Sequence, residues 1–195
     1  MQAHALMASD EEDTKVGPVP VLSDPVEVAI REGRHREALA TCARLHGAVL
    51  GRLAMALLGS QADADEATQE TLLRAHRAMA TYRGEGSVKA WLCGIARHVC
   101  AHMLETRRRG RELLEIVPVE DEARDMFATR QRSRAIRDGL AQLKPSEREA
   151  LVLRFVADLS PREIATACNL DEATARKRIS RALARLRTVM PQEIE

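Results

Sequence analysis

Apolar residues recur three or four positions apart along most of this chain, the spacing that gives a helix one buried face. Alanine, leucine, arginine and glutamate dominate, and glycine and proline are few inside the long segments. Runs of β-branched residues are absent from the sequence. We therefore predict an all-α fold. With 195 residues, 45% of them hydrophobic, the chain can bury a core in one or two domains.

The same sequence argues against membrane-spanning, secreted and catalytic proteins. Arg52 interrupts the longest apolar stretch, residues 48–58, so we expect no membrane-spanning helix. An acidic run at 10–13 stands where a secretory signal would need basic and apolar residues, so we expect a cytoplasmic protein with reduced cysteines. No phosphate-binding glycine loop, nucleophile elbow or paired catalytic carboxylate motif is present. We expect neither catalytic activity nor a cofactor.

Breaks in the helical pattern divide the chain into four parts. Residues 1–24 lack periodicity and are predicted to form a disordered leader. Residues 25–109 carry helical patterns over 25–58, 63–82 and 88–108, which predict a first domain. Asp63 and Glu66 have the spacing of an N-cap and its partner, so the second pattern is predicted to start at Asp63. Small residues along this pattern form a stripe that predicts the close approach of another helix: Ala64, Ala67, Thr71, Ala75 and Ala78. Residues 110–128 are predicted to be an acidic linker. Residues 129–190 resume the helical pattern and predict a second, smaller domain.

The formal net charge of +1 conceals a strong segregation of charge along the chain. Residues 74–111 have a net charge of +7 and residues 171–190 of +4, whereas residues 112–125 between them have −5 and residues 1–34 have −4. Two basic blocks separated by an acidic one predict two contacts with a polyanion.

The second domain has the spacing of a helix-turn-helix. Ser146 with Glu149 and Ser160 with Glu163 are spaced as capping boxes, and Asp171 is predicted to cap the last helix after a short turn at 168–170. In such a motif the last helix lies in the major groove of DNA.

The last helix divides into two faces. One face is apolar: Ile179, Ala182, Leu183, Leu186 and Met190. The opposite face and its edges carry side chains suited to bases and phosphates, which we predict to contact DNA: Thr174, Arg176, Lys177, Arg178, Ser180 and Arg181. The alternative interpretation of this face is an ordinary solvated basic surface.

Two sets of motifs resemble one known family. The second domain, through 143–149, 159–165 and 174–182, resembles region 4 of the bacterial extracytoplasmic-function (ECF) sigma factors of the sigma-70 family. In the first domain, residues 63–75 resemble region 2.2, and residues 82–97 resemble regions 2.3 and 2.4. The resemblance implies two small helical domains: a region 2 bundle at 25–109 and a region 4 helix-turn-helix at 129–190.

The resemblance also implies a function: an RNA polymerase sigma factor that directs promoter-specific initiation and is not itself an enzyme. Its partners would be promoter DNA, the clamp helices of the largest subunit of core RNA polymerase, and a cognate anti-sigma factor. The implied polymerase-binding residues are Asp65, Gln69, Glu70 and Arg74. The residues implied to hold the −10 element are Arg83, Lys89, Trp91, Arg97 and His98, and the last helix of the chain would read the −35 element.

This sequence departs from the family pattern in the predicted −10 region. Val88 and His76 stand where aromatic residues are usual, and His98 replaces a common asparagine. Trp91 belongs to an apolar helical stripe, which favours a role in core packing.

Two other functions stay open at this point. The chain could be a helix-turn-helix regulator that binds duplex DNA without polymerase. It could also be a helical interaction protein, or a thiol or metal sensor built on Cys93, His98, Cys100 and His102. The spacing of these last residues directs Cys100 away from the two histidines, so we expect no metal site.

Overall fold

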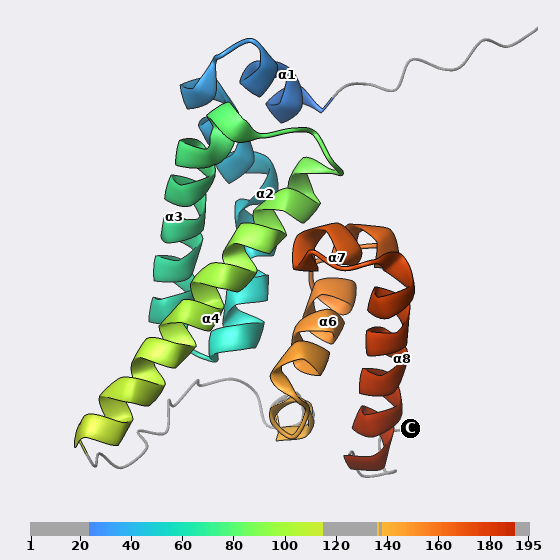
Figure 1. Cartoon of the computed structure of the whole chain (residues 1–195). Coiled ribbons are helices and arrows are strands. Elements are labelled where there is room, and N and C mark those ends of the chain that lie inside the picture. Colours follow the sequence, from blue (N-terminus) through green and yellow to red (C-terminus); the bar gives the residue numbers. More distant parts are fainter. Residues whose placement is uncertain (1–23, 115–135, 137, 190–195) are drawn as a thin grey trace, which may run out of the picture.

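The fold is described from a computed structural model, which covers residues 24–114, 136 and 138–189. Within those residues the regular elements are all helices, as the sequence predicts (Figure 1). The first domain contains α1 (Pro25–Arg31), α2 (His35–Leu58), α3 (Gln61–Ala78), the 3₁₀ turn η1 (Met79–Thr81) and α4 (Val88–Leu114). The second contains α6 (Pro145–Phe155), α7 (Pro161–Cys168) and α8 (Glu172–Val189).

Small residues on α3 let it lie close against α2 and α4. Ala64, Ala67, Thr71 and Ala75 are all fully buried, which agrees with the stripe of small side chains in the sequence. The Thr71 hydroxyl donates to the carbonyl oxygen of Ala67 at 2.6 Å, so its burial leaves no unpaired hydroxyl proton.

Two helix starts in the first domain differ from those predicted. The pattern over 25–58 is not one helix, because Gly33 adopts a positive φ of 73° and separates α1 from α2. The α3 helix is capped by Ser60, whose hydroxyl accepts from the Asp63 N–H, rather than by Asp63. Asp63 instead forms an ion pair with Arg107 of α4.

The start of α6 also differs from the prediction. Pro145 occupies its first turn, and the Glu147 carboxylate accepts from the Lys144 N–H at 3.1 Å. The predicted cap of Ser146 with Glu149 is therefore wrong, and Glu149 is available for a contact outside its own helix. At the other end of the first domain, α4 continues through Leu114, beyond the predicted boundary at residue 109.

The other two caps of the second domain are confirmed. Ser160 and Glu163 form a reciprocal capping box at the start of α7, with Pro161 in the first turn. Asn169 ends α7 in the left-handed conformation, with a φ of 53°. The Asp171 carboxylate accepts from the Thr174 N–H at 2.7 Å and thereby caps α8.

The two domains share one apolar cluster. Leu92, Cys93 and Ala96 of α4 belong to the same buried cluster as Leu159 and Ile164 of the second domain. Figure 1 shows α7 lying against the first half of α4. The predicted disordered leader at 1–24, apart from Asp24, and the predicted linker beyond Leu114 lie outside the described residues. Among the described helices, none is long and apolar enough to cross a membrane.

Candidate nucleic-acid and partner interfaces

The predicted DNA-reading face of α8 is exposed on its basic side and buried on the other. Lys177, Ser180 and Arg181 are exposed, whereas Ala175 and Ala182 are fully buried. Ile179, Leu183 and Leu186 pack around Ala182 against Leu143 and Leu151. This packing fixes the rotation of α8 about its own axis, so that the basic side faces away from the domain. Met190, predicted on the apolar face, lies outside the described residues.

Two of the six predicted contact residues on α8 are already engaged within the helix. The Arg176 guanidinium pairs with Glu172 one turn earlier, with its Nε 2.9 Å from the Glu172 carboxylate. The Thr174 hydroxyl donates to the Asp171 cap at 2.6 Å, and the hydrogen bonds from Thr174 lower the pKa of Asp171. Arg178 is half-buried. Lys177 and Arg181 are therefore the cations most available to a ligand on this face.

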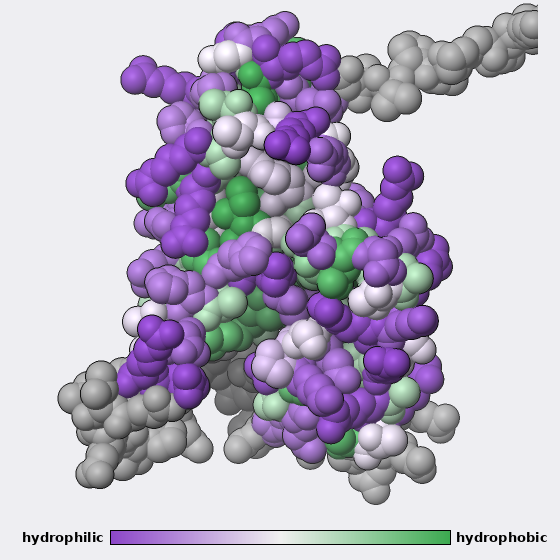
Figure 2. Space-filling view, viewed as in Figure 1, coloured by the Kyte–Doolittle hydropathy of each residue, from purple (hydrophilic) through white to green (hydrophobic). Residues whose placement is uncertain are grey.

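A groove runs between α3 and α4 and contains three of the four predicted polymerase-binding residues. Its polar lining includes Gln69, Glu70 and Arg74, and its apolar floor includes Leu73 and Met103. Figure 2 shows apolar surface between hydrophilic side chains over these two helices. Glu70 accepts from the Arg74 Nε at 2.6 Å, which holds both side chains along the rim. Leu73 is 49% exposed, a large apolar surface for a side chain with no covering partner in the described chain.

Asp65, the fourth residue of that predicted set, lies outside the groove. It is exposed near the start of α3 and accepts from the Gln61 amide at 2.8 Å.

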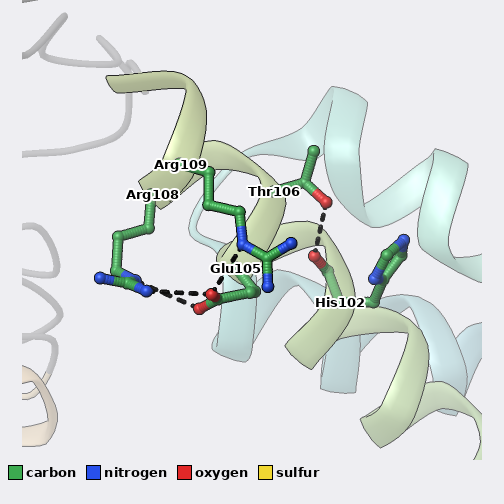
Figure 3. Close-up of polar contacts among 5 residues, drawn as sticks. All are labelled: His102, Glu105, Thr106, Arg108 and Arg109. Atoms are coloured by element: carbon green, nitrogen blue, oxygen red, sulfur yellow. Dashed lines mark hydrogen bonds and ion pairs between the residues drawn. The ribbon is translucent and has the colours of Figure 1, made fainter. Parts of the chain in front are cut away.

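The second half of α4 carries a cluster of arginines organised by one carboxylate (Figure 3). Glu105 accepts from Arg108 at 3.0 Å and from the Arg109 Nε at 3.0 Å. These hydrogen bonds, first from Arg108 and then from Arg109, lower the pKa of Glu105 to about 2. Both arginines remain largely exposed, so the cluster presents oriented guanidinium groups that could bind phosphates.

The loop before α4 and the first turns of that helix hold the predicted −10 residues. Trp91 is half-buried, with its ring centroid 4.8 Å from that of Tyr82, and both rings pack against the core cluster. This agrees with the core-packing role that its apolar stripe favours. Arg83 is exposed, and its Nη1 lies 3.8 Å from Glu85 Oε1. His98 is largely exposed, but the partial desolvation of its ring and then the positive charge of the neighbouring Arg97 lower its pKa.

Lys89 and Arg97 both hold contacts with the second domain. They lie two helical turns apart on α4, with Cys93 between them on the same face. The Lys89 ammonium donates to the carbonyl oxygen of Asp158 at 3.0 Å. Arg97 Nη1 lies 3.2 Å from Glu149 Oε1, and the two side chains are only 17% and 15% exposed. Ser87 adds a third contact, because its hydroxyl donates to Glu163 at 2.6 Å.

The cysteines have the environment of inert thiols. Cys42, Cys93 and Cys100 are fully buried, and burial raises the pKa of Cys93 to about 12 and those of Cys42 and Cys100 to about 11. Within the described residues, no group of three or more histidine, cysteine or acidic side chains converges where a metal ion could be held. The geometry thus gives no support to a thiol or metal sensor.

Comparison with known proteins places the two domains in one family. Residues 42–110 match the model of Sigma-70 region 2, and residues 133–186 match that of Sigma-70, region 4. Over 135 residues the chain is 34% identical to the ECF RNA polymerase sigma factor SigC of Mycobacterium tuberculosis, with 66% of this chain and 70% of SigC covered. The chain belongs to the ECF RNA polymerase sigma factors.

A second relative and a solved structure extend the comparison. The ECF RNA polymerase sigma factor SigG of Mycobacterium tuberculosis is 32% identical over 187 residues, with 82% of this chain covered. The match covers 47% of SigG, so the chain spans about half the length of that curated relative. A structure of the sigma factor RpoE with the anti-sigma factor NepR from Bartonella quintana shares the fold, at a TM-score of 0.54 and 22% identity. It covers 83% of this chain and 96% of RpoE.

Within this ECF sigma factor, the predicted sites fall on three surfaces. The −35 set lies on α8 of region 4, and three of the four polymerase residues line the α3–α4 groove of region 2. The predicted −10 set is divided: Arg83 and His98 are exposed, Trp91 packs on Tyr82, and Lys89 and Arg97 contact region 4.

Sequence reasoning missed the region 4 side of this contact. Glu149 was predicted to be a cap partner and Glu163 a cap alone, yet both reach across to region 2. No local signal could have shown this, because both partners lie more than 50 positions away in the chain. The apolar floor of the groove was also missed, although an exposed Leu73 at helical spacing from Gln69 could have indicated it.

Proposed function

We propose that this chain binds core RNA polymerase and directs promoter-specific transcription initiation, with region 2 engaging polymerase and the −10 element and region 4 reading the −35 element. One observation carries the proposal: the same chain combines a basic, outward-facing recognition helix with a separate polar groove that has an apolar floor. A regulator that binds only duplex DNA needs the first of these surfaces and has no use for the second.

The α3–α4 groove has the chemistry of a helix-binding site. An exposed leucine and a methionine in its floor can accept apolar side chains of a partner helix, and the Glu70–Arg74 pair can exchange hydrogen bonds with the partner's charged residues. We assign this groove to the clamp helices of the largest polymerase subunit.

The α8 surface has the chemistry of major-groove readout. Lys177 and Arg181 can donate to guanine edges, and Ser180 can contact a base or a phosphate. Arg176 and Arg178 lie at the edges of the face, where phosphates of the two strands would approach. The arginine cluster around Glu105 adds a sequence-independent contact with nucleic acid.

The proposed role requires no reaction by the chain itself, since polymerase carries out the chemistry. We also propose that the protein acts in the cytoplasm, where polymerase and promoter DNA are found. An anti-sigma factor is a further proposed partner, by analogy with the RpoE relative bound to NepR.

The test adds the purified chain to bacterial core RNA polymerase and maps transcription starts on a genomic fragment library. Start sites that depend on the chain, with shared upstream sequences, would support the proposal. DNA binding by the chain alone, with no initiation when polymerase is present, would refute it in favour of a duplex-binding regulator.

Groove variants then test the assignment of the polymerase contact. Gln69→Ala combined with Glu70→Ala should weaken co-purification with core polymerase while the helical content is kept, since neither side chain is buried in the core. The matched control is Glu37→Gln, which changes a carboxylate in an exposed ion pair with Arg34 at the start of α2. Normal co-purification of the double variant would remove the groove from the polymerase interface.

A further inference from the structure

One face of α4 is occupied by region 4 in this structure. Lys89, Cys93 and Arg97 form a stripe along the helix, and the residues at both ends of the stripe hold hydrogen bonds to region 4. Cys93 between them is fully buried. This stripe coincides with two of the cations predicted to hold the −10 element, so the same side chains have two competing sets of partners.

The contact between region 4 and α4 buries both apolar side chains and an ion pair. Leu159 and Ile164 of region 4 are fully buried in a cluster with Leu92 and Cys93 of region 2. The Arg97–Glu149 pair is largely shielded from water, where the Coulomb attraction is stronger and the loss of one partner leaves a costly buried charge.

The backbones also meet closely. A methyl group on Gly94 would come within 3.1 Å of the Ala167 carbonyl oxygen, so any side chain at residue 94 would require α7 to move away from α4 by a few tenths of an ångström.

The contact nevertheless leaves one group unsatisfied. Arg97 Nη1 is paired with Glu149 and Nη2 lies 2.9 Å from His98 Nε2, but Nε is buried with no hydrogen-bond partner among the described residues. An unpaired buried N–H costs free energy. The phosphates of a DNA strand, which are strong acceptors, could satisfy the whole guanidinium group at once.

We propose that region 4 closes over the −10 surface of region 2 in the free chain, with Glu149 occupying the position of a phosphate against Arg97, and that region 4 must leave this surface before the −10 strand can bind. The assignment of the −10 strand to α4 rests on the proposed function. The closed contact itself rests only on the distances and burial given above.

The closed contact can be measured in the free chain through its own cysteines. Opening would expose the buried Cys93 on α4 and increase the exposure of the half-buried Cys168, which lies at the end of α7 directly after Ala167. Cys100 belongs to a buried cluster of α2, α3 and α4 alone, and Cys42 of α2 is fully buried in the larger cluster that includes Val26 and Ile30 of α1, so we expect both to stay protected. Alkylation with N-ethylmaleimide, followed by mass spectrometry of each cysteine peptide, therefore reports opening with an internal control.

The variant Glu149→Gln keeps the shape of the side chain and removes its charge. Glu149 holds no capping hydrogen bond, so α6 is expected to remain folded. Loss of a charge-assisted hydrogen bond should raise the open fraction, and with it the alkylation rates of Cys93 and Cys168, roughly tenfold. Glu37→Gln should label like the wild type, because its ion pair lies within the first domain.

A second variant acts from the other side of the contact. Gly94→Ala places a methyl group against the Ala167 carbonyl while favouring the α4 helix, so it should open the contact without unfolding region 2. Faster labelling confined to Cys93 and Cys168 in either variant supports the proposal. Unchanged labelling of both cysteines in both variants, or an equal rise at all four cysteines in both, would overturn it.

A transcription assay separates this proposal from the proposed function. If wild-type chain directs initiation, Glu149→Gln should form open complexes several-fold faster than wild type, whereas an equal rate would refute the competition with the −10 strand. If wild-type chain directs no initiation, the proposed function fails, and the alkylation result still decides whether region 4 closes over α4.

Discussion

Replacing Arg181 by alanine should reduce selectivity for the −35 element without destabilising the fold. Arg181 is exposed on the outer face of α8, and the described residues offer it no ion pair. Truncating such a side chain changes the free energy of unfolding by about 0.5 kcal/mol or less. A loss of promoter-binding free energy larger than this would therefore reflect a lost contact with DNA rather than a destabilised fold.

The size of the effect follows from the same geometry. A bidentate contact with a guanine edge contributes about 1–3 kcal/mol of discrimination, and each 1.4 kcal/mol corresponds to about tenfold in affinity. Arg181 should show this full loss because it gives up no pair on binding. Arg176 should show a smaller loss, since its guanidinium must exchange Glu172 for a phosphate when DNA arrives.

The assay measures binding of the reconstituted holoenzyme to two promoter fragments, one with the cognate −35 sequence and one with that sequence mutated. Arg181→Ala should bring the two affinities closer together. The matched control, Arg187→Ala, removes the same charge farther along α8 and should weaken both affinities equally or not at all. An unchanged ratio between the fragments with Arg181→Ala would refute base readout. An equal loss on both fragments, with a salt slope reduced by about 1, would make Arg181 a phosphate contact.

Three further predictions concern stability and charge. Ser160→Ala should lower the free energy of unfolding by about 1 kcal/mol, because it removes the hydroxyl of the α7 capping box; urea denaturation measures this, and no change would show that the cap is dispensable. Glu105→Gln should strengthen binding to mixed-sequence DNA and steepen its salt dependence, because Arg108 and Arg109 lose their shared carboxylate partner. Filter binding at several salt concentrations measures this dependence, and an unchanged slope would contradict the prediction. The free energy of unfolding should fall as the pH rises from about 9 toward 12. Burial raises the pKa of Cys93 from the ordinary value of 9.0 to about 12 in the folded chain, so over this range only the unfolded chain loses the thiol proton. Cys93→Ala should make this part of the pH profile less steep, with the remaining fall due to other thiols such as Cys42 and Cys100, and an equally steep fall would show that Cys93 does not contribute.

The parts of the fold that sequence reasoning predicted are those controlled by local chemistry. The stripe of small residues on α3 predicted a close approach of helices, and the spacing of Ser160 with Glu163 predicted the start of α7. Both depend on residues within two helical turns of one another. The separation of apolar and basic faces on α8 also depends on residues close together in the chain, so the sequence predicted it as well.

The parts that were missed depend on distant residues or on competition between nearby ones. Ser146 and Glu149 have ideal spacing for a cap, but Lys144 and Glu147 take that role two positions earlier, with Pro145 in the first turn. Glu149 then pairs with Arg97 across the domain interface, which no periodicity could indicate. The contact between the domains also accounts for the low exposure of Arg97 and for the hydrogen bond of Lys89, two residues that sequence reasoning assigned to DNA alone.

The position of α4 has a consequence for how promoter preference can diverge in related proteins. Its 27 residues span about 40 Å and, in succession, contact region 4, line the groove with Val99 and Met103, and carry the arginine cluster. A substitution on almost any face of α4 therefore disturbs packing or a partner surface. The outer face of α8 has few contacts within the described chain: its cap, the Glu172 pair and the contact of Arg185 with Glu147 of α6. New promoter sequences should consequently be acquired first through changes at Lys177, Ser180 and Arg181, while α4 changes slowly.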